Sequence, residues 1–330
     1  MNGIAKGETV TYLEAIRRAL RDAMAADGRV FLIGEDIGHY GGAFKATAGL
    51  LEEFGSERVI DTPISESGFV GAAIGAALMG LRPVVEFQFI DFMANAFNMV
   101  VNFAGTNRYR WGACVPLVLR GPAGGGVHGS AFHSANPEGF FHRAPGLKIV
   151  YPATAEDAYG LLREAILDPN PVLYFEHKFL YRRIKGELPP QDYRVPIGKA
   201  KVVRRGRDLS VFTYAAMLHL ALEVAEKLAA ENIEIEVVDL RTLKPLDEET
   251  ILASVKKTSR ALVLNEEPLT GSLAGEVAAR IAEHAFWYLD APVARVCCAD
   301  TPVPYSPPLE AAYLPSAERL EKRIRELLQA

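Results

Sequence analysis

Residues 58–71 place a single carboxylate at the point where a strand gives way to a helix. The β-branched run stops before Pro63, because proline keeps the residue before it extended. Ser65 or Ser67 is expected to cap the helix that follows. Glu66 then lies at the carboxyl edge of a parallel strand, where open α/β sheets bind their ligands. Glu66 is therefore a candidate catalytic group, although a glutamate at a strand end more often caps a helix or forms a salt bridge.

The helix expected at residues 68–79 consists almost entirely of Ala, Gly, Val and Ile, so it is apolar on every face. A helix of this kind suits burial against another chain or domain. Glycines cost helix stability, and close approach of another backbone is the expected compensation. The glycines in and after this helix are Gly68, Gly71, Gly75 and Gly80.

The second candidate region is residues 124–129, which match the pattern G-x-G-x-x-G after a strand. A dinucleotide site needs a helix that begins in the glycines and an acidic residue at the end of the next strand. Here the glycines lead into a polar stretch with Asn136-Pro137, so we interpret them as a flexible active-site loop. The nearby His128, His133 and His142 do not have zinc spacing. A loop histidine is better suited to acid–base work.

Composition excludes several classes of protein. A chain of 330 residues with 49% hydrophobic and 23% charged residues suits a globular protein of two domains. The net charge of -5 gives no basic field for nucleic acid, and no apolar run reaches membrane-spanning length. The three cysteines form neither a zinc pattern nor a disulfide framework, and the amino terminus resembles neither a signal nor a transit peptide. We therefore expect a cytoplasmic location.

Apolar runs alternate with segments of helical spacing along the chain, and these predict strands and helices respectively. The expected strands are 30–34, 59–60, 84–89, 115–119, 147–150, 172–175, 209–214, 233–240, 261–264 and 294–298. The expected helices are 9–25, 68–79, 93–107, 155–167, 217–230, 247–256, 271–286 and 314–328. This alternation predicts an α/β fold of two domains, each with a mostly parallel sheet flanked by helices. The boundaries expected are 1–185 and 201–330, with a polar, proline-containing linker at 186–200.

Several motifs in order over nearly the whole chain resemble one family: the beta subunit of the thiamine-diphosphate-dependent first component of 2-oxo acid dehydrogenase complexes. The motifs are Gly34-Glu35-Asp36, residues 60–71 and 80–89, Asn107-Arg108-Tyr109-Arg110, His133-Ser134, Pro145-Gly146-Leu147-Lys148 and residues 239–245. The resemblance implies a transketolase-like fold with an amino-terminal pyrimidine-binding domain and a transketolase C-terminal-like domain.

The resemblance also implies roles for particular residues. Glu66 would hydrogen-bond a ring nitrogen of the cofactor's aminopyrimidine and promote the tautomer that takes a proton from the thiazolium carbon. His133 would be the second catalytic residue, near substrate and lipoyl. Glu35 would belong to an acidic cluster that passes protons between two active sites, and Gln88 and Phe92 would contact the cofactor. His142 is not carried over, because related chains have their histidine one position later.

The metal-binding half of a thiamine site is missing from this sequence. Related enzymes hold the diphosphate through a divalent cation with a Gly-Asp-Gly motif and a later Asn, whereas this chain has only Ala26-Asp27-Gly28. An alpha subunit is therefore expected to hold Mg²⁺ and share the thiamine diphosphate, in an α2β2 heterotetramer. By resemblance, a monovalent cation such as K⁺ would be bound by the carbonyls of Leu117, Ala165, Ile166 and Asp168, together with Asn170.

The activity implied is oxidative decarboxylation of a 2-oxo acid, followed by reductive acylation of lipoyl on a partner acyltransferase. Residues 175–182 resemble branched-chain enzymes more than pyruvate enzymes, and pyruvate or acetoin dehydrogenase beta subunits are the alternatives. A non-catalytic, regulatory α/β subunit is the alternative from another class. The presence of both Glu66 and His133 argues against it.

Overall fold

The computed structural model describes residues 7–330, and these form two compact units. The first unit comprises the chain up to Ala123 together with Phe140–Ile197. The second unit comprises Gly124–Gly139, which we call the glycine loop, and Gly198–Ala330. After Ile197, within the expected linker 186–200, the chain passes from the first unit to the second. The sequence did not predict that the glycine loop belongs to the second unit.

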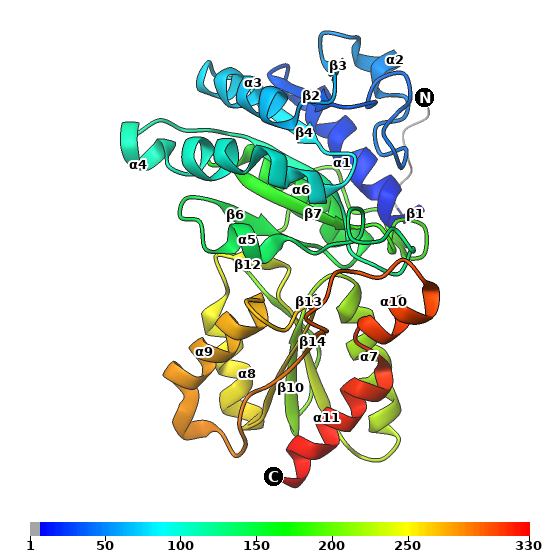
Figure 1. Ribbon diagram of the computed structural model, residues 1–330, viewed down its shortest axis with the longest axis vertical. Coiled ribbons are helices and arrows are strands. Elements are labelled where there is room, and N and C mark those ends of the chain that lie inside the picture. The colour runs from blue at the N-terminus through cyan, green and yellow to red at the C-terminus, as the bar shows by residue number, and fades with distance from the viewer. Residues whose placement is uncertain (1–6) are drawn as a thin grey trace. The chain divides into compact units, whose positions relative to one another are not determined.

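The first unit is built on a sheet in which the strands lie in the order β6-β7-β5-β4-β2-β3 (Figure 1). All of these neighbouring pairs are parallel, as expected. The strands are β2 (Val30–Gly34), β3 (Val59–Asp61), β4 (Arg82–Glu86), β5 (Val118–Ala123), β6 (Lys148–Val150) and β7 (Val172–His177). A separate antiparallel pair joins β1 (Thr9–Thr11) to β8 (Lys185–Glu187).

The helices of this unit cover both faces of the sheet. The chain passes from β3 to β4 through α3 (Glu66–Leu78), and from β6 to β7 through α6 (Ala155–Leu167). These two crossovers run across the sheet in opposite directions. Because such crossovers are right-handed, α3 and α6 lie on opposite faces. Helix α1 (Tyr12–Ala26) packs beside α6, and a short helix, α2 (Leu50–Phe54), precedes β3.

The segment expected to be helical at 93–107 is helical as far as Ala104, but it is not one regular α-helix. It consists of a 3₁₀ segment, η1 (Ile90–Ala96), and a π-helical segment, η2 (Met99–Ala104), and a short helix, α4 (Asn107–Trp111), follows after a turn. Residues with weak helix propensity, including Asn, Phe, Thr, Val and Gly, make up much of this stretch. Gly105 also lies so close to the carbonyl of Pro145 that a side chain there would be 3.0 Å from the oxygen.

The second unit has its own sheet, with strands in the order β14-β13-β10-β11-β9. Only the edge strand β9 (Lys201–Arg204) is antiparallel to its neighbour in this sheet. The other strands are β10 (Leu209–Thr213), β11 (Ile235–Asp239), β13 (Ala261–Pro268) and β14 (Ala294–Cys298), and a further short strand, β12 (Thr242–Lys244), follows β11. The parallel arrangement agrees with the expected fold class.

Two pairs of helices enclose this second sheet, one pair on each face (Figure 1). Helix α7 (Ala216–Ala229) packs with α11 (Ala317–Gln329), and α8 (Glu248–Thr258) packs with α9 (Leu273–Ala285). Asp247 caps α8, as its type and position suggest, by accepting a hydrogen bond from the Thr250 N–H at 3.3 Å. Three short helices complete the chain: α5 (Glu138–His142), η3 (Phe286–Tyr288) and α10 (Pro307–Tyr313). No helix within residues 7–330 is long and apolar enough to cross a membrane.

Candidate functional site

Glu66 is the first residue of α3, and residues 62–65 connect it to the end of β3 at Asp61. Its side chain is buried, yet its carboxylate forms no hydrogen bond or ion pair with any residue that the structure describes. Ser65 is the N-cap residue, one of the two expected, but its side chain makes no cap hydrogen bond. The Ser67 hydroxyl does not cap the helix and donates to the Asn95 carbonyl at 2.5 Å. The partial positive charge of the helix N-terminus is left to stabilise the Glu66 carboxylate.

A second acid, Glu35, lies beside Glu66 at the end of β2. Burial raises the pKa of Glu35, and the neighbouring charges of Glu66 and Asp36 raise it further. Its Oε1 is buried and has no hydrogen-bond partner in the described part of the chain. The side-chain amide of Gln88 donates to Asp36 Oδ2 at 2.7 Å, so residues that follow β2 and β4 are joined at this edge of the sheet.

Phe92 lies in η1, the segment that packs against α3. Its half-buried ring meets the ring of Phe89 edge-on, with centroids 6.3 Å apart. The structure therefore brings Glu35, Glu66, Gln88 and Phe92 to the edge formed by the ends of the neighbouring strands β2, β3 and β4. A nitrogen heterocycle that offers N–H groups fits this edge, because two carboxylates there have unused acceptor oxygens and an aromatic ring lies near them.

His133, the other predicted catalytic residue, lies in the glycine loop and thus in the second unit. Four residues of this loop have left-handed backbone: Gly124, Gly126, His128 and Ser130. No helix begins among these glycines, and the next one starts at Glu138. This geometry agrees with the interpretation of the segment as a loop and not as a dinucleotide fingerprint.

Two buried acids that the sequence analysis missed contact the first half of the glycine loop. Glu266 Oε1, at the end of β13, accepts the Gly125 N–H at 2.6 Å. Glu310, in α10, accepts the N–H groups of Gly126 at 2.9 Å and His128 at 3.2 Å. Both acids lie far from the loop in sequence, and Glu310 lies in a short helix without a recognisable motif, so the sequence alone gave no signal.

Two further acids, Glu138 and Glu267, share one tyrosine. The Tyr214 hydroxyl lies 2.9 Å from Glu138 Oε1 and 3.2 Å from Glu267 Oε2. Burial raises the pKa of Glu267 to about 7. Burial and the neighbouring charge of Glu267 raise the pKa of Glu138 well above its usual value. A proton is therefore retained between these two carboxyl groups near neutral pH.

Comparisons with known proteins agree with the architecture of both units. Residues 8–183 match the family described as transketolase, pyrimidine binding domain, and residues 198–320 match transketolase, C-terminal domain. The 2-oxoisovalerate dehydrogenase subunit beta of Bacillus subtilis is 48% identical over 325 residues, which cover 97% of this chain and 99% of the relative. The pyruvate dehydrogenase E1 component subunit beta of the same organism is 44% identical over 322 residues, with 97% and 99% coverage.

The chain belongs to the family of E1 beta subunits of 2-oxo acid dehydrogenases. A solved structure described as a split-gene transketolase, inactive beta4 tetramer, matches with a TM-score of 0.81 and covers 97% of this chain and 98% of that one. At 23% identity that match supports the fold alone. The family and fold class predicted from the motifs are thus confirmed.

The E1 beta chain also contains a buried charge network that the sequence analysis missed. Arg120, in β5, contacts Glu86 at the end of β4 and binds Glu176 in β7, with Nη2 2.8 Å from Glu176 Oε2. The Tyr181 hydroxyl donates to Glu176 at 2.6 Å. Burial raises the pKa of Glu86, whereas Arg120 opposes that rise. The network joins the three neighbouring strands β7, β5 and β4.

The residues predicted to bind a monovalent cation lie in the first unit, near the end of α6 and the starts of β5 and β7. Three of their carbonyls already accept hydrogen bonds, among them that of Leu117 from the Val172 N–H at 2.9 Å and that of Ile166 from Arg82 Nη1 at 2.7 Å. The ammonium of Lys148 contacts the Asp168 carboxylate, whose other oxygen accepts the Asn170 N–H. The Ala165 carbonyl accepts the Asp168 N–H at 3.3 Å. A bound cation at these residues stays a prediction.

Asp27, the acid of Ala26-Asp27-Gly28, caps the end of α1 and is engaged by arginine. The guanidinium of Arg29 donates to its carboxylate, which lowers the pKa of Asp27 to about 2. Within residues 7–330 no group of three or more His, Cys, Asp or Glu side chains could hold a metal ion. The Asp27 carboxylate is therefore paired with the Arg29 guanidinium.

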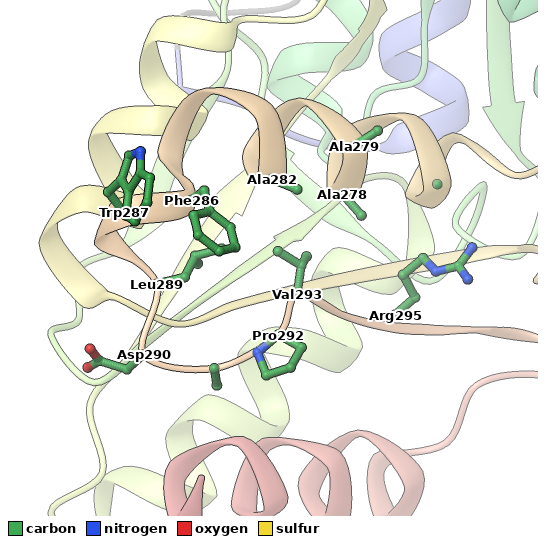
Figure 2. Close-up of a pocket in the computed structure, with 12 residues that line it drawn as sticks. Ala278, Ala279, Ala282, Phe286, Trp287, Leu289, Asp290, Pro292, Val293 and Arg295 are labelled. Atoms are coloured by element: carbon green, nitrogen blue, oxygen red, sulfur yellow. The ribbon is translucent and has the colours of Figure 1, made fainter.

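A surface hollow of about 880 Å³ lies in the second unit and contains none of the predicted site residues (Figure 2). Small residues of α9, such as Ala278 and Ala282, form one wall, and the rings of Phe286 and Trp287 lie at one end. Arg295 lies toward the opposite end of the hollow in Figure 2. The ionisable side chains of its lining are Asp290 and Arg295, and no histidine, cysteine or serine accompanies them, so we do not take the hollow as a candidate active site.

Proposed function

We propose that this chain is a catalytic E1 beta subunit that binds the aminopyrimidine of thiamine diphosphate through Glu66 and takes part in the oxidative decarboxylation of a 2-oxo acid. The observation that carries the proposal is a pair of neighbouring acids with unused acceptor oxygens. The Glu66 carboxylate has no partner among the described residues, and Oε1 of Glu35, whose pKa is raised, is buried without a hydrogen bond. A buried polar atom without a hydrogen bond is costly to stability, and binding of a ligand N–H group would offset that cost.

When bound, thiamine diphosphate supplies a nucleophilic carbon for attack on the 2-oxo group. Glu66 would share a proton with a ring nitrogen, which favours the tautomer able to act as a base. The neighbouring Glu35 has a raised pKa and holds its own proton more tightly than an exposed glutamate does, so it can exchange a proton with Glu66. Phe92 would pack against the ring, and Gln88 orients Asp36 beside Glu35.

A second chain is required to complete the site, because the described residues offer no divalent-cation cluster. We assign Mg²⁺ and the diphosphate to an alpha subunit, in an α2β2 assembly that acylates lipoyl on a partner acyltransferase in the cytoplasm. The outer face of α3 supports such a contact: Gly68, Ala72, Gly75 and Met79 are exposed, and Gly75 has no neighbour within 4 Å of where a side chain would begin. A helix face of small residues lets another backbone come close.

The substrate we propose is a branched-chain 2-oxo acid. Residues 175–182, which include the buried Glu176 and His177, resemble the branched-chain enzymes more than the pyruvate enzymes. The 48% identical relative is named for 2-oxoisovalerate and the 44% identical one for pyruvate. Pyruvate is the competing substrate, and turnover of both acids by one preparation distinguishes them.

Glu66→Gln in the enzyme reconstituted with its alpha subunit tests the proposal. The amide cannot exchange the proton that the carboxylate shares, so decarboxylation should fall by at least about 100-fold, within the range of general acid–base catalysis. The melting temperature should fall little or rise, because the neutral amide removes a buried charge. The exposed Glu57→Gln is the matched control and should keep full activity.

Decarboxylation is measured with 2-oxoisovalerate and with pyruvate, using an artificial electron acceptor, and lipoyl acylation is measured in parallel. Near wild-type turnover of Glu66→Gln would overturn the assignment of Glu66. A reconstituted wild type that turns over neither acid would favour the non-catalytic subunit. A higher kcat/KM for pyruvate would replace the proposed substrate with the alternative.

A further inference from the structure

We propose that Glu266 and Glu310 are positioning residues, whose carboxylates hold the glycine loop and thereby set the place of His133. The proposal rests on the proposed function in one respect, because His133 matters only if the chain is catalytic. The contacts that support it all lie within the second unit.

Glu310 accepts two hydrogen bonds from the loop and has one further close contact with it. Besides the N–H groups of Gly126 and His128, its Oε2 lies 2.6 Å from Nδ1 of His128. Hydrogen bonds to a buried carboxylate are among the strong ones in proteins, since the charge has lost its water. Glu310 is itself fixed in place, because Tyr313 in the same helix is buried in a cluster with Cys298 and Val303.

Glu266 holds the loop at two separated points. Its Oε1 accepts the Gly125 N–H at 2.6 Å and the side-chain amide of Asn136 at 3.0 Å. Asn136 also lies 3.2 Å from the backbone carbonyl of Glu266. The segment that carries His133 is therefore tied on both sides to the end of β13. Fixing both ends of a loop removes much of its conformational freedom before any ligand binds.

Gly125 shows how closely the loop fits against these acids. A side-chain carbon at Gly125 would lie 3.2 Å from Leu314 Cδ2, 3.3 Å from Glu310 Oε1 and 3.4 Å from Glu266 Oε1. Its backbone does not require glycine for conformational reasons, since Gly125 is not among the residues with positive φ. The absence of a side chain thus serves the contact with the carboxylates, and alanine there would push the loop away from them.

The charges around the loop suit this role. Glu266 and Glu310 accept hydrogen bonds from N–H groups of the loop. Glu138 and Glu267 share the Tyr214 hydroxyl instead, and their raised pKa values mean that they retain a proton between them. The retained proton lowers the negative charge near the two acids that hold the loop amides.

The experiment compares Glu310→Gln and Gly125→Ala with the wild type, in the full chain and in the enzyme reconstituted with its alpha subunit. Glu249→Gln, an exposed acid of α8, and Gly28→Ala, which has open space around it, are the matched controls. Amide hydrogen exchange over residues 124–130 reports the placement of the loop without any need for activity. Exchange in β13 and α11 reports whether the fold is intact.

We expect exchange of the Gly126 and His128 amides to rise by about tenfold or more in Glu310→Gln and Gly125→Ala, while β13 and α11 stay protected. Acyl transfer to lipoyl should fall by about 10- to 100-fold, and decarboxylation with an artificial acceptor much less, because a small displacement of a catalytic group is costly. Unchanged loop exchange in both variants would overturn the proposal, as would equal loss of the two half-reactions. A wild type without dehydrogenase activity would refute the proposed function, and the exchange data would still decide whether the two acids hold the loop.

Discussion

At the scale of single residues, two buried glutamates of this chain show opposite states. The carboxylate of Glu66 has no hydrogen bond from the described residues, whereas that of Glu310 accepts two and also contacts the His128 ring. A buried acid with its acceptors satisfied stabilises the loop that it contacts, and one with unused acceptors is available for a ligand. The same residue type therefore serves structure in one unit and, by our proposal, chemistry in the other.

His133→Ala should separate the two half-reactions. Decarboxylation depends mainly on the cofactor and Glu66, whereas acyl transfer also needs a proton delivered to a departing sulfur, a task that imidazole suits. We expect the overall reaction to fall by roughly 100-fold or more, and decarboxylation with an artificial acceptor to fall less. Equal losses would place His133 in the shared first step, and no loss would remove it from the site.

Glu267→Gln should reduce the dependence of stability on pH. The folded pKa of Glu267, about 7, lies above its ordinary value of 4.5, so between these values the folded chain keeps a proton that the unfolded chain has lost. The free energy of unfolding therefore falls as pH rises through this window, by up to about 3 kcal/mol. Urea unfolding at about pH 5 and about pH 8 should show a smaller difference for Glu267→Gln than for the wild type or Glu249→Gln. An unchanged difference would mean that another group retains the proton.

The sequence allowed prediction of the site residues that form local motifs, but not of their long-range partners. Glu66 could be placed because a strand, a proline and a helix lie next to one another in sequence. Glu266 and Glu310 could not, since more than a hundred residues separate each of them from the loop amides that they accept. Periodicity and capping report only on near neighbours, so contacts of this kind become visible only in the folded chain.

At the scale of elements, the strands and helices with clear periodicity were predicted well. Helix α6 and strand β14 have the expected bounds. The segment from η1 to α4 does not form the expected helix, because close approach of Gly105 to Pro145 and weak helix propensity act together there. The apolar spacing of that segment was genuine, but it reflects burial against α3 and not a continuous helix.

Arg120→Met should destabilise the first unit. Removal of the guanidinium leaves Glu86 and Glu176 buried without their shared cation, and breaking a buried ion pair typically costs about 3–5 kcal/mol. Urea unfolding of the variant should show this loss, and it should be larger at pH values where both acids are ionised. The exposed Arg207→Met is the control. A triple substitution of Arg120, Glu86 and Glu176 by apolar residues should recover much of the stability, and failure to do so would mean that packing, not charge, sets the cost.

At the scale of the whole molecule, our proposal assigns the pyrimidine side of the cofactor site to this chain and the diphosphate side to an alpha subunit. We expect the isolated chain to bind magnesium thiamine diphosphate weakly, because the described residues hold no divalent-cation cluster. Calorimetry with the chain alone should give a Kd well above about 1 µM, and addition of the alpha subunit should tighten it. Tight binding without a partner would contradict the division of the site between two chains.

The glycine loop makes the two units inseparable in sequence, although each has its own sheet. The chain leaves the first unit after Ala123, contributes the loop to the second unit, and returns at Phe140. A cut at the boundary near Ile197 would therefore leave Glu266 and Glu310 in one fragment and the amides that they accept in the other. Any chimera of two relatives would have to exchange residues 124–139 together with the carboxy-terminal unit. The carboxy-terminal unit is thus built from two segments that are separated in sequence, and not from one contiguous stretch of the chain.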